Sequence, residues 1–279
     1  MSAKTTVGIV QMCANADVEA NLDSTLSLVS GAADAGARVV LVPEAFAFIG
    51  RERDRAEWLE RLPEPNSTDA QGPILERCAE TARTTGSHLV LGGFPEQAPD
   101  GRAYNTCVHL TPDGVVAAAY RKIHLFDVDL ADGTRLAESR GTAAGDRAVI
   151  TETPFGPLGL TVCYDVRFPL LYQALADQGA MAIAVPSAFT RTTGRDHWHV
   201  LLRARAIECQ CYILAPAQHG DHGHRGRQSY GHGLVVDPWG DVVAECEGGD
   251  GFALADIDPA RVAEVRAQLP SLANRGRFQ

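Results

Sequence analysis

The stretch Gly159-Leu160-Thr161-Val162-Cys163-Tyr164-Asp165-Val166-Arg167-Phe168-Pro169 decides the expected fold. Residues 159–162 read as the end of a short apolar strand, and residues 170–175 as a helix. Cys163 therefore lies at a strand–helix junction, where free backbone N–H groups and the helix dipole favour a thiolate. This placement indicates a cysteine nucleophile, although a free cysteine is also often a small buried apolar residue.

Length and composition predict a globular chain without nucleic-acid or membrane partners. The 279 residues are 45% apolar and 22% charged, enough for one large α/β domain or two small ones. The net charge of −10 and the lack of a basic stripe argue against nucleic acid. The N-terminus has no secretory signal pattern, and Pro43 and Glu44 interrupt the longest apolar run. Seven cysteines without CxxC spacing predict a reducing compartment, hence a cytoplasmic protein.

Strand and helix patterns alternate along the chain and predict a two-sheet α/β sandwich. Strands are expected at residues 7–12, 39–42, 89–93, 107–110, 115–120, 158–162, 181–185, 212–217, 233–236, 242–246 and 252–257. Helices are expected at residues 18–35, 74–84, 170–175, 196–208 and 259–268. Thr-Pro-Asp-Gly at 111–114 and Asp-Pro-Trp-Gly at 237–240 predict hairpin turns.

Three expected strands end at a reactive or ionisable residue. Glu44 follows strand 39–42, Lys122 follows strand 115–120, and Cys163 follows strand 158–162. Ligand sites in α/β folds gather beyond the carboxyl ends of strands. A cysteine nucleophile needs a base and an oxyanion donor, which a carboxylate and an ammonium group can supply. The residues alone leave open that Glu44 is a solvated carboxylate and Lys122 a surface residue.

The length of one loop and the residue types of another suggest functional roles. The polar loop 121–145 is long for a compact domain, which predicts a functional role. The loop 219–231 is rich in glycine and carries metal-ligand residue types at His219, Asp221, His222 and His224. A glycine-rich loop lacks a rigid ligand frame, and Cys209 and Cys211 are too close for the usual zinc pair. We therefore expect no metal, and a polar loop near the mouth of a pocket.

Three motifs resemble those of the nitrilase superfamily of carbon–nitrogen hydrolases, and the resemblance covers nearly the whole chain. The segments at 43–46 (Pro-Glu-Ala-Phe), 120–126 (Tyr-Arg-Lys-Ile-His-Leu-Phe) and 159–169 are similar to its glutamate, lysine and cysteine motifs. Glu138 matches the position of a second, positioning glutamate. The resemblance implies a four-layer αββα sandwich, a single domain over residues 1–279, and no metal or organic cofactor.

The resemblance also implies roles and partners. Glu44 would be the general base, Cys163 the nucleophile, and Lys122 with the backbone N–H of Tyr164 the oxyanion donors. Glu138 would orient Lys122. Subunits would pair as a homodimer or larger homo-oligomer through the helix after Cys163 and the helix 196–208. The C-terminal tail would pack on a partner subunit.

Finer similarities point to a branch of this family. Cys-Tyr-Asp at 163–165 is typical of its amidases, whereas nitrile-hydrolysing members carry Cys-Trp-Glu. The segment 165–169 resembles ω-amidases and deaminated-glutathione amidases, in which the arginine, here Arg167, binds a substrate carboxylate. A structural ion pair is the alternative role for Arg167, which we expect in the first turn of the helix. Phe189, Thr192 and Thr193 also match this branch and are expected to contact substrate.

These similarities predict an amidase that hydrolyses a small ω-amide to a carboxylate and ammonia through a cysteine thioester. The expected substrate is deaminated glutathione, N-(4-oxoglutaramate)-L-cysteinylglycine. The alternatives are α-ketoglutaramate, an N-carbamoyl amine, or a non-catalytic binding protein, which the intact set of Glu44, Lys122 and Cys163 disfavours. One departure is His199, where relatives commonly carry glutamate. In relatives that glutamate lines or supports the substrate pocket, so the histidine alters the substrate specificity that the resemblance implies.

Overall fold

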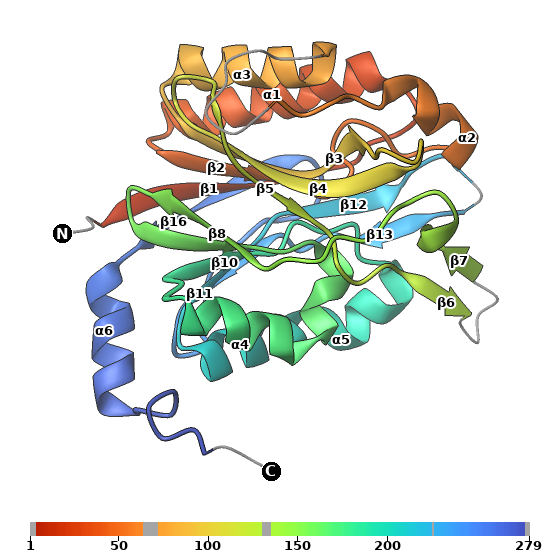
Figure 1. Cartoon of the computed structure of the whole chain (residues 1–279). Coiled ribbons are helices and arrows are strands. Elements are labelled where there is room, and N and C mark those ends of the chain that lie inside the picture. The colour runs from red at the N-terminus through yellow and green to blue at the C-terminus, as the bar shows by residue number, and fades with distance from the viewer. Residues whose placement is uncertain (1–3, 64–71, 130–134, 225, 277–279) are drawn as a thin grey trace.

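Two β-sheets pack face to face between two layers of helices in the computed structural model (Figure 1), which describes residues 4–63, 72–129, 135–224 and 226–276. Helices α1 (Val18–Asp34) and α3 (Pro73–Thr85) cover the first sheet. Helices α4 (Pro169–Asp177) and α5 (Arg191–Cys209) cover the second. The expected four-layer αββα sandwich is therefore confirmed.

The first sheet has the order β13-β12-β1-β2-β3-β4-β5, with β16 also paired to β1. Its strands are β1 (Thr5–Met12), β2 (Val39–Val42), β3 (His88–Gln97), β4 (Ala103–Leu110), β5 (Val116–Arg121), β12 (Ala217–Asp221), β13 (Gln228–Tyr230) and β16 (Gly251–Ile257). The second sheet has the order β15-β14-β11-β10-β9-β8. Its strands are β8 (Val149–Thr153), β9 (Gly156–Leu160), β10 (Ala182–Ala184), β11 (Tyr212–Ala215), β14 (Leu234–Val236) and β15 (Val242–Glu245).

Strand β2 shows how the sequence specifies the two cores. Val39 and Leu41 belong to the cluster between the sheets, whereas Val40 and Val42 pack in the cluster beneath α1 and α3. Successive side chains of a strand point to opposite faces, so a strand buried on both faces must be apolar throughout. The Val-Val-Leu-Val run satisfies this requirement, and all four residues are buried.

The expected strand 212–217 is divided in two, which corrects the sequence analysis. β11 pairs with β10 and β14 in the second sheet, whereas β12 pairs with β1 and β13 in the first. Pro216 lies between them, and proline has no N–H to continue a ladder. The chain therefore crosses between the sheets at this point, and part of the expected loop 219–231 is strand.

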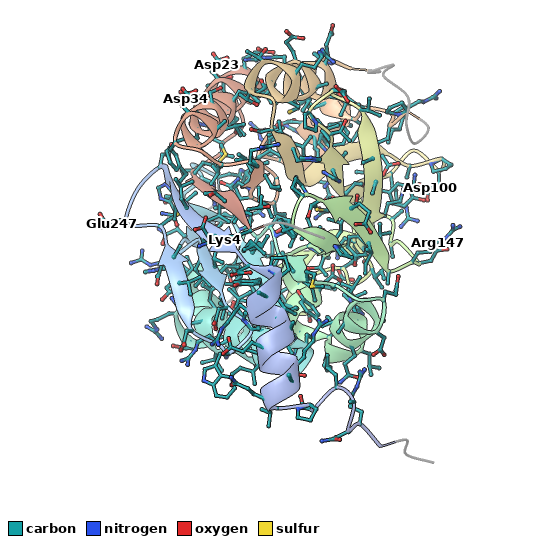
Figure 2. All side chains as sticks on the ribbon, turned by 90° about the vertical axis from the view of Figure 1, so that its left-hand side faces the viewer. Lys4, Asp23, Asp34, Asp100, Arg147 and Glu247 are labelled. Atoms are coloured by element: carbon teal, nitrogen blue, oxygen red, sulfur yellow. The ribbon has the colours of Figure 1, made fainter. Side chains whose placement is uncertain are left out.

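The remaining elements are short or peripheral. Helix α2 (Glu52–Arg55) is followed by the 3₁₀ turn η1 (Ala56–Trp58), and loop 121–145 contains β6 (Asp127–Asp129), β7 (Arg135–Ala137) and the 3₁₀ turn η2 (Glu138–Arg140). Helix α6 (Pro259–Gln268) extends from one end of the sandwich (Figure 1). Charged side chains such as Asp23, Asp34 and Arg147 project outward (Figure 2). In the described ranges, every helix is too short or too polar to cross a membrane.

Candidate active site

The structure brings Glu44, Lys122 and Cys163 together between the two sheets. They follow β2, β5 and β9, so strands of both sheets position them. Lys122 Nζ lies 3.0 Å from Glu44 Oε1, and the Cys163 thiol hydrogen-bonds to the Glu44 carboxylate. Glu44 is 7% exposed and Lys122 2%, which rules out the solvated loop and surface alternatives. The arrangement places a thiol, a carboxylate and an ammonium group at one point.

Lys122 is held as a buried cation between two carboxylates. Its Nζ donates to Glu44 Oε1 at 3.0 Å and to Glu138 Oε2 at 2.9 Å. Burial opposes the charged form, but the carboxylates of Glu138 and Glu44 outweigh it and raise the pKa of Lys122. Glu138, in η2, also accepts a hydrogen bond from the Phe126 N–H at 2.7 Å. Loop 121–145 therefore folds back so that Glu138 fixes the ammonium group.

Glu44 and Cys163 form a carboxylate–thiol pair. Burial favours a neutral Glu44, but the Lys122 charge and hydrogen bonds from Asn105 and Cys163 lower the pKa of its carboxyl. Burial and the Glu44 charge raise the pKa of the Cys163 thiol well above its usual value. Burial and the Glu44 charge therefore oppose the thiolate that the helix end was expected to favour. The carboxylate is instead placed to remove the thiol proton during attack.

The backbone around Cys163 also differs from the expected strand–helix junction. β9 ends at Leu160, a 3₁₀ turn η3 (Cys163–Arg167) follows, and α4 begins only at Pro169. Cys163 has φ +45°, a left-handed value that costs energy for a non-glycine residue. Its N–H donates to Pro186 O at 3.0 Å, which connects the strained residue to the segment that follows β10.

Asp165 locks this turn to the lysine motif, a role that the sequence analysis did not assign. Its Oδ2 accepts from the Val162 N–H at 2.9 Å and from the Tyr120 hydroxyl at 2.8 Å. Its Oδ1 lies 2.7 Å from His124 Nδ1. Asp165 is completely buried, so these partners offset the cost of burying a carboxylate. These hydrogen bonds hold the turn after β9 against the loop after β5.

Asn105 on β4 is the second residue that the sequence analysis missed. Its Nδ2 donates to Glu44 Oε1 and to Glu138 Oε1, at 2.9 Å each. Its backbone O accepts from the Lys122 N–H at 2.9 Å. The opposite amide orientation would place Oδ1 against two carboxylate oxygens, so the assigned orientation follows from the charges. Asn105 therefore links both carboxylates that flank Lys122.

Replacement of Asn105 by leucine is expected to lower kcat about 100-fold, because small displacements of catalytic groups have effects of this size. KM should change little, since Asn105 holds the carboxylates and not the substrate. Steady-state kinetics with a thermal melting curve check this expectation. A change in KM alone, or wild-type kinetics, would show that Asn105 does not position the carboxylates.

Among the four expected substrate-binding residues, Arg167 lies after β9, Phe189 lies after β10, and both threonines lie in α5. The Arg167 guanidinium lies 5.1 Å from the Phe189 ring and 3.3–3.4 Å from His197 Nδ1. Arg167 ends η3 and is not in the first turn of α4, which corrects the expectation. In the described parts of the chain no acidic side chain forms an ion pair with it, so the structural ion pair is not found there. Thr192 and Thr193 lie in the first turn of α5.

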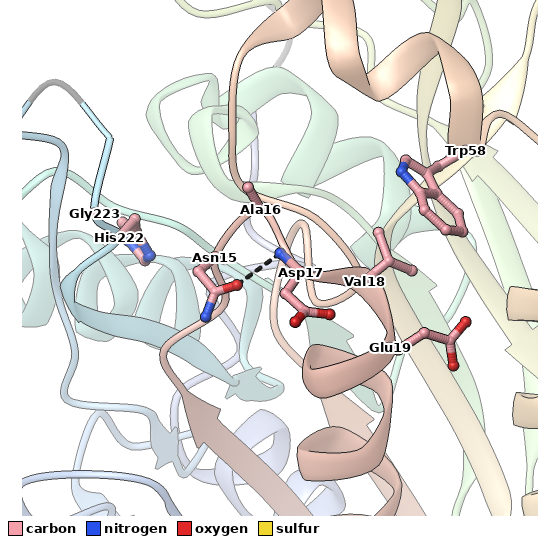
Figure 3. Close-up of a pocket in the computed structure, with 8 residues that line it drawn as sticks. All are labelled: Asn15, Ala16, Asp17, Val18, Glu19, Trp58, His222 and Gly223. Atoms are coloured by element: carbon pink, nitrogen blue, oxygen red, sulfur yellow. Dashed lines mark hydrogen bonds between the residues drawn. The ribbon is translucent and has the colours of Figure 1, made fainter.

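The loop that suggested a metal uses its side chains elsewhere. His222 is buried, with Nδ1 2.7 Å from Ala14 O and Nε2 2.8 Å from Ser229 Oγ. His219 Nε2 lies 2.6 Å from Asp250 Oδ1. His222 also lines a surface pocket of about 630 Å³ at the start of α1, with Trp58 on its opposite side (Figure 3). The residues that line this pocket do not include Glu44, Lys122 or Cys163.

Comparisons with known proteins show the family of the chain. A profile of the carbon–nitrogen hydrolase family matches residues 6–267. A deaminated glutathione amidase of Synechocystis sp. is 42% identical over 95% of this chain and 96% of its own length. The human deaminated glutathione amidase is 45% identical over 96% of this chain and 81% of its own length. The crystal structure of the Caenorhabditis elegans NitFhit protein has a TM-score of 0.88 and 37% identity, and covers 99% of this chain.

The chain belongs to the carbon–nitrogen hydrolase family. The resemblance to the nitrilase superfamily is thereby confirmed, and so is the expectation of a hydrolase. This chain spans 66% of the NitFhit chain, so the likeness to that protein concerns only part of it.

Proposed function

We propose that the protein is an amidase that forms a thioester on Cys163, with deaminated glutathione as its substrate. The cluster of Glu44, Lys122 and Glu138 beside the Cys163 thiol carries this proposal. Two carboxylates and one ammonium group give this cluster a net charge of −1. The Glu44 carboxylate faces the thiol and can take its proton, while the Glu138 carboxylate holds the ammonium group of Lys122. The intact cluster also disfavours a non-catalytic binding protein.

The proposed reaction has two stages. Glu44 takes the thiol proton while Cys163 sulfur attacks the amide carbonyl, and the oxyanion is stabilised by Lys122 and the Tyr164 N–H. Protonated Glu44 gives the proton to the leaving nitrogen, the carbon–nitrogen bond breaks, and a thioester remains. Glu44 then takes a proton from water, which attacks the thioester, and the thiol leaves with that proton. The net result is amide plus water giving carboxylic acid plus amine.

The leaving group depends on the amide, which corrects the expectation that ammonia is always released. α-Ketoglutaramate is a primary amide and gives ammonia, whereas deaminated glutathione gives the amine of cysteinylglycine. Both leave the same acid, 2-oxoglutarate, because they share the same 2-oxo acyl unit. The names of the relatives from Synechocystis and human favour deaminated glutathione.

A product screen tests the proposal. We expect 2-oxoglutarate from deaminated glutathione with the highest kcat/KM, and 2-oxoglutarate with ammonia from α-ketoglutaramate at a lower one. N-carbamoyl amino acids and nitriles serve as competing substrates in the same screen. A preference for either of these would overturn the proposed substrate class but not the proposed nucleophile.

Replacement of Arg167 by lysine is expected to raise KM for both 2-oxo acids about 10-fold or more, because lysine cannot offer the planar two-pronged contact to a carboxylate. KM for a neutral amide of similar length should change far less. Arg195→Lys is a matched control, since Arg195 is an exposed arginine on α5 that pairs with Asp196. An equal loss on the neutral amide would make Arg167 a structural residue.

We propose that the protein forms a homodimer through the outer face of helices α4 and α5. Leu170 on α4 is 77% exposed, and Val200 and Ile207, two turns apart on α5, are 67% and 47% exposed. Apolar residues that share a helix face and meet solvent favour burial against another subunit. The C-terminal tail remains proposed to pack on that subunit.

All seven cysteines are free, which supports a cytoplasmic location.

A further inference from the structure

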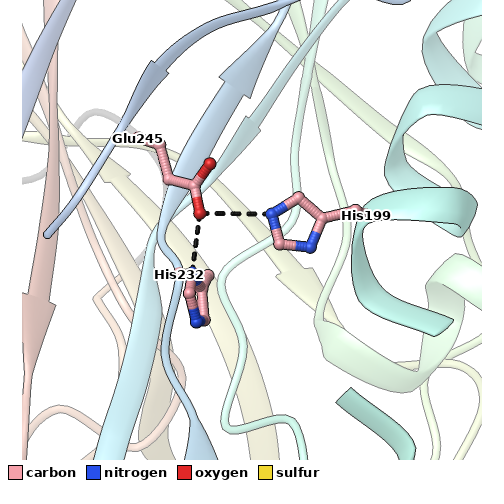
Figure 4. Close-up of side chains that lie close together, drawn as sticks. All are labelled: His199, His232 and Glu245. Carbon is pink, nitrogen blue, oxygen red and sulfur yellow. Dashed lines mark hydrogen bonds and ion pairs between the residues drawn. The ribbon is translucent and has the colours of Figure 1, made fainter. Parts of the chain in front are cut away.

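A second cluster of reactive side chains lies outside the proposed catalytic site. His199 on α5, His232 just before β14 and Glu245 at the end of β15 point toward one another (Figure 4). Glu245 Oε1 lies 3.2 Å from His199 Nε2 and 2.6 Å from His232 Nδ1, and the three ligating atoms all lie within 4.8 Å of one another. The side chains are 34%, 44% and 35% exposed, so an ion from solvent can reach them.

We propose that these three residues bind one divalent transition-metal ion of the zinc class. Zinc bonds to histidine nitrogen and carboxylate oxygen are about 2.0–2.2 Å long, so tetrahedral ligands lie roughly 3.5 Å apart. The observed separations approach this spacing, and small side-chain rotations complete it. Two imidazoles with one carboxylate favour Zn²⁺, Co²⁺ or Ni²⁺ over Mg²⁺ or Ca²⁺, which prefer oxygen ligands. Water fills the remaining positions.

The backbone holds His232 in a fixed place, unlike the glycine-rich loop beside it. His232 has φ +57°, and a non-glycine residue keeps such a conformation only where its surroundings impose it. Its carbonyl accepts from Trp198 Nε1 at 2.8 Å, and the next N–H, of Gly233, donates to Gln11 Oε1 at 3.0 Å. The Tyr230 ring lies 4.5 Å from the His232 ring. These contacts restrict the imidazole before any ion binds.

A bound ion would join α5 to the β14–β15 hairpin near Phe189, one of the expected substrate-binding residues. Trp198 precedes His199, and its ring lies 5.1 Å from Phe189. The Tyr230 N–H donates to Phe189 O at 2.9 Å. Linking helix and hairpin at the surface should therefore stabilise the fold next to Phe189. This inference concerns binding only, and it stands whether or not the proposed amidase reaction is correct.

Metal titration of the chelator-treated protein tests the proposal. We expect calorimetry with Zn²⁺ to give one equivalent bound, and Co²⁺ to give a visible spectrum without a thiolate-to-metal band. The substitutions His199→Gln, His232→Gln and Glu245→Gln should each weaken binding by more than about 10-fold, since loss of a supporting residue already has effects of that size. Zn²⁺ should raise the melting temperature of the wild-type protein but not of these variants.

His219→Gln is the matched control. His219 pairs with Asp250 at 2.6 Å, as His232 does with Glu245, but among the described residues the two are not part of a three-ligand group. This variant should bind Zn²⁺ like the wild-type protein. Melting curves without metal verify that each variant folds. Binding that does not saturate, binding equally strong in the three cluster variants, or a cobalt–thiolate band would overturn the proposal, because each assigns the ion elsewhere.

Discussion

A Cys163→Ala variant is expected to lose amide hydrolysis by about 10⁴-fold or more, the size of effect seen when a catalytic nucleophile is removed. No other described side chain beside Glu44 offers sulfur for a thioester. The substitution removes only the sulfur, and both residues carry a Cβ, so the strained backbone at φ +45° is not further strained. The melting temperature should stay close to the wild-type value. Steady-state kinetics and thermal melting check both expectations.

Cys13→Ala is the matched control for this variant. Cys13 is also a partly exposed free cysteine, but its Sγ hydrogen-bonds to Asp221 O, away from Glu44 and Lys122. It should retain wild-type activity. A Cys163→Ala enzyme with activity near that of Cys13→Ala would exclude Cys163 as the nucleophile.

The Glu44→Gln variant is expected to lose about 10²–10⁴-fold in kcat, the usual contribution of a general base. Glutamine keeps the shape of the side chain but cannot take the Cys163 proton or activate water, so both stages should slow. It also removes one of the two negative charges beside Lys122. Single-turnover kinetics separate the two stages, and both rates should fall.

Glu96→Gln is the control for removing a buried glutamate. Glu96 is 3% exposed and pairs with Arg121, as Glu44 pairs with Lys122, but it lies outside the cluster. We expect this variant to lose stability while its kcat stays near the wild-type value. If both glutamate variants lost kcat equally, the loss would reflect damage to the fold and not the absence of a base.

Local sequence patterns predicted a helix or strand correctly where its structure depends only on the residues within it. Residues 39–42 are a strand with the predicted ends because their apolar run meets two cores. Asp17 caps α1 as its side-chain type predicts, and it accepts from the Ala20 N–H at 3.1 Å. The proline-rich sequence of residues 63–73 predicts a loop, and residues 64–71 lie outside the described ranges. The crossing at Pro216 depends on which sheet each flanking strand joins, which local pattern does not specify.

Part of the candidate site could be predicted from local sequence patterns, and part could not. Glu44, Lys122 and Cys163 follow strands that the pattern reveals, so their positions could be predicted. Asn105 lies inside β4, and its role arises from the pairing of β4 with its neighbours and from the fold of loop 121–145. The raised pKa of the Cys163 thiol follows from burial and from the Glu44 charge, neither of which a sequence pattern measures.

Trapping the acyl-enzyme tests the central claim most directly. The wild-type enzyme is mixed separately with deaminated glutathione and with α-ketoglutaramate, quenched in acid within the first turnovers, and analysed by intact mass and peptide mapping. Both substrates share one acyl unit, so we predict the same added mass, a 4-carboxy-4-oxobutanoyl group, on the peptide that contains Cys163. An adduct on another residue, or product formed by Cys163→Ala at the wild-type rate, would contradict the claim.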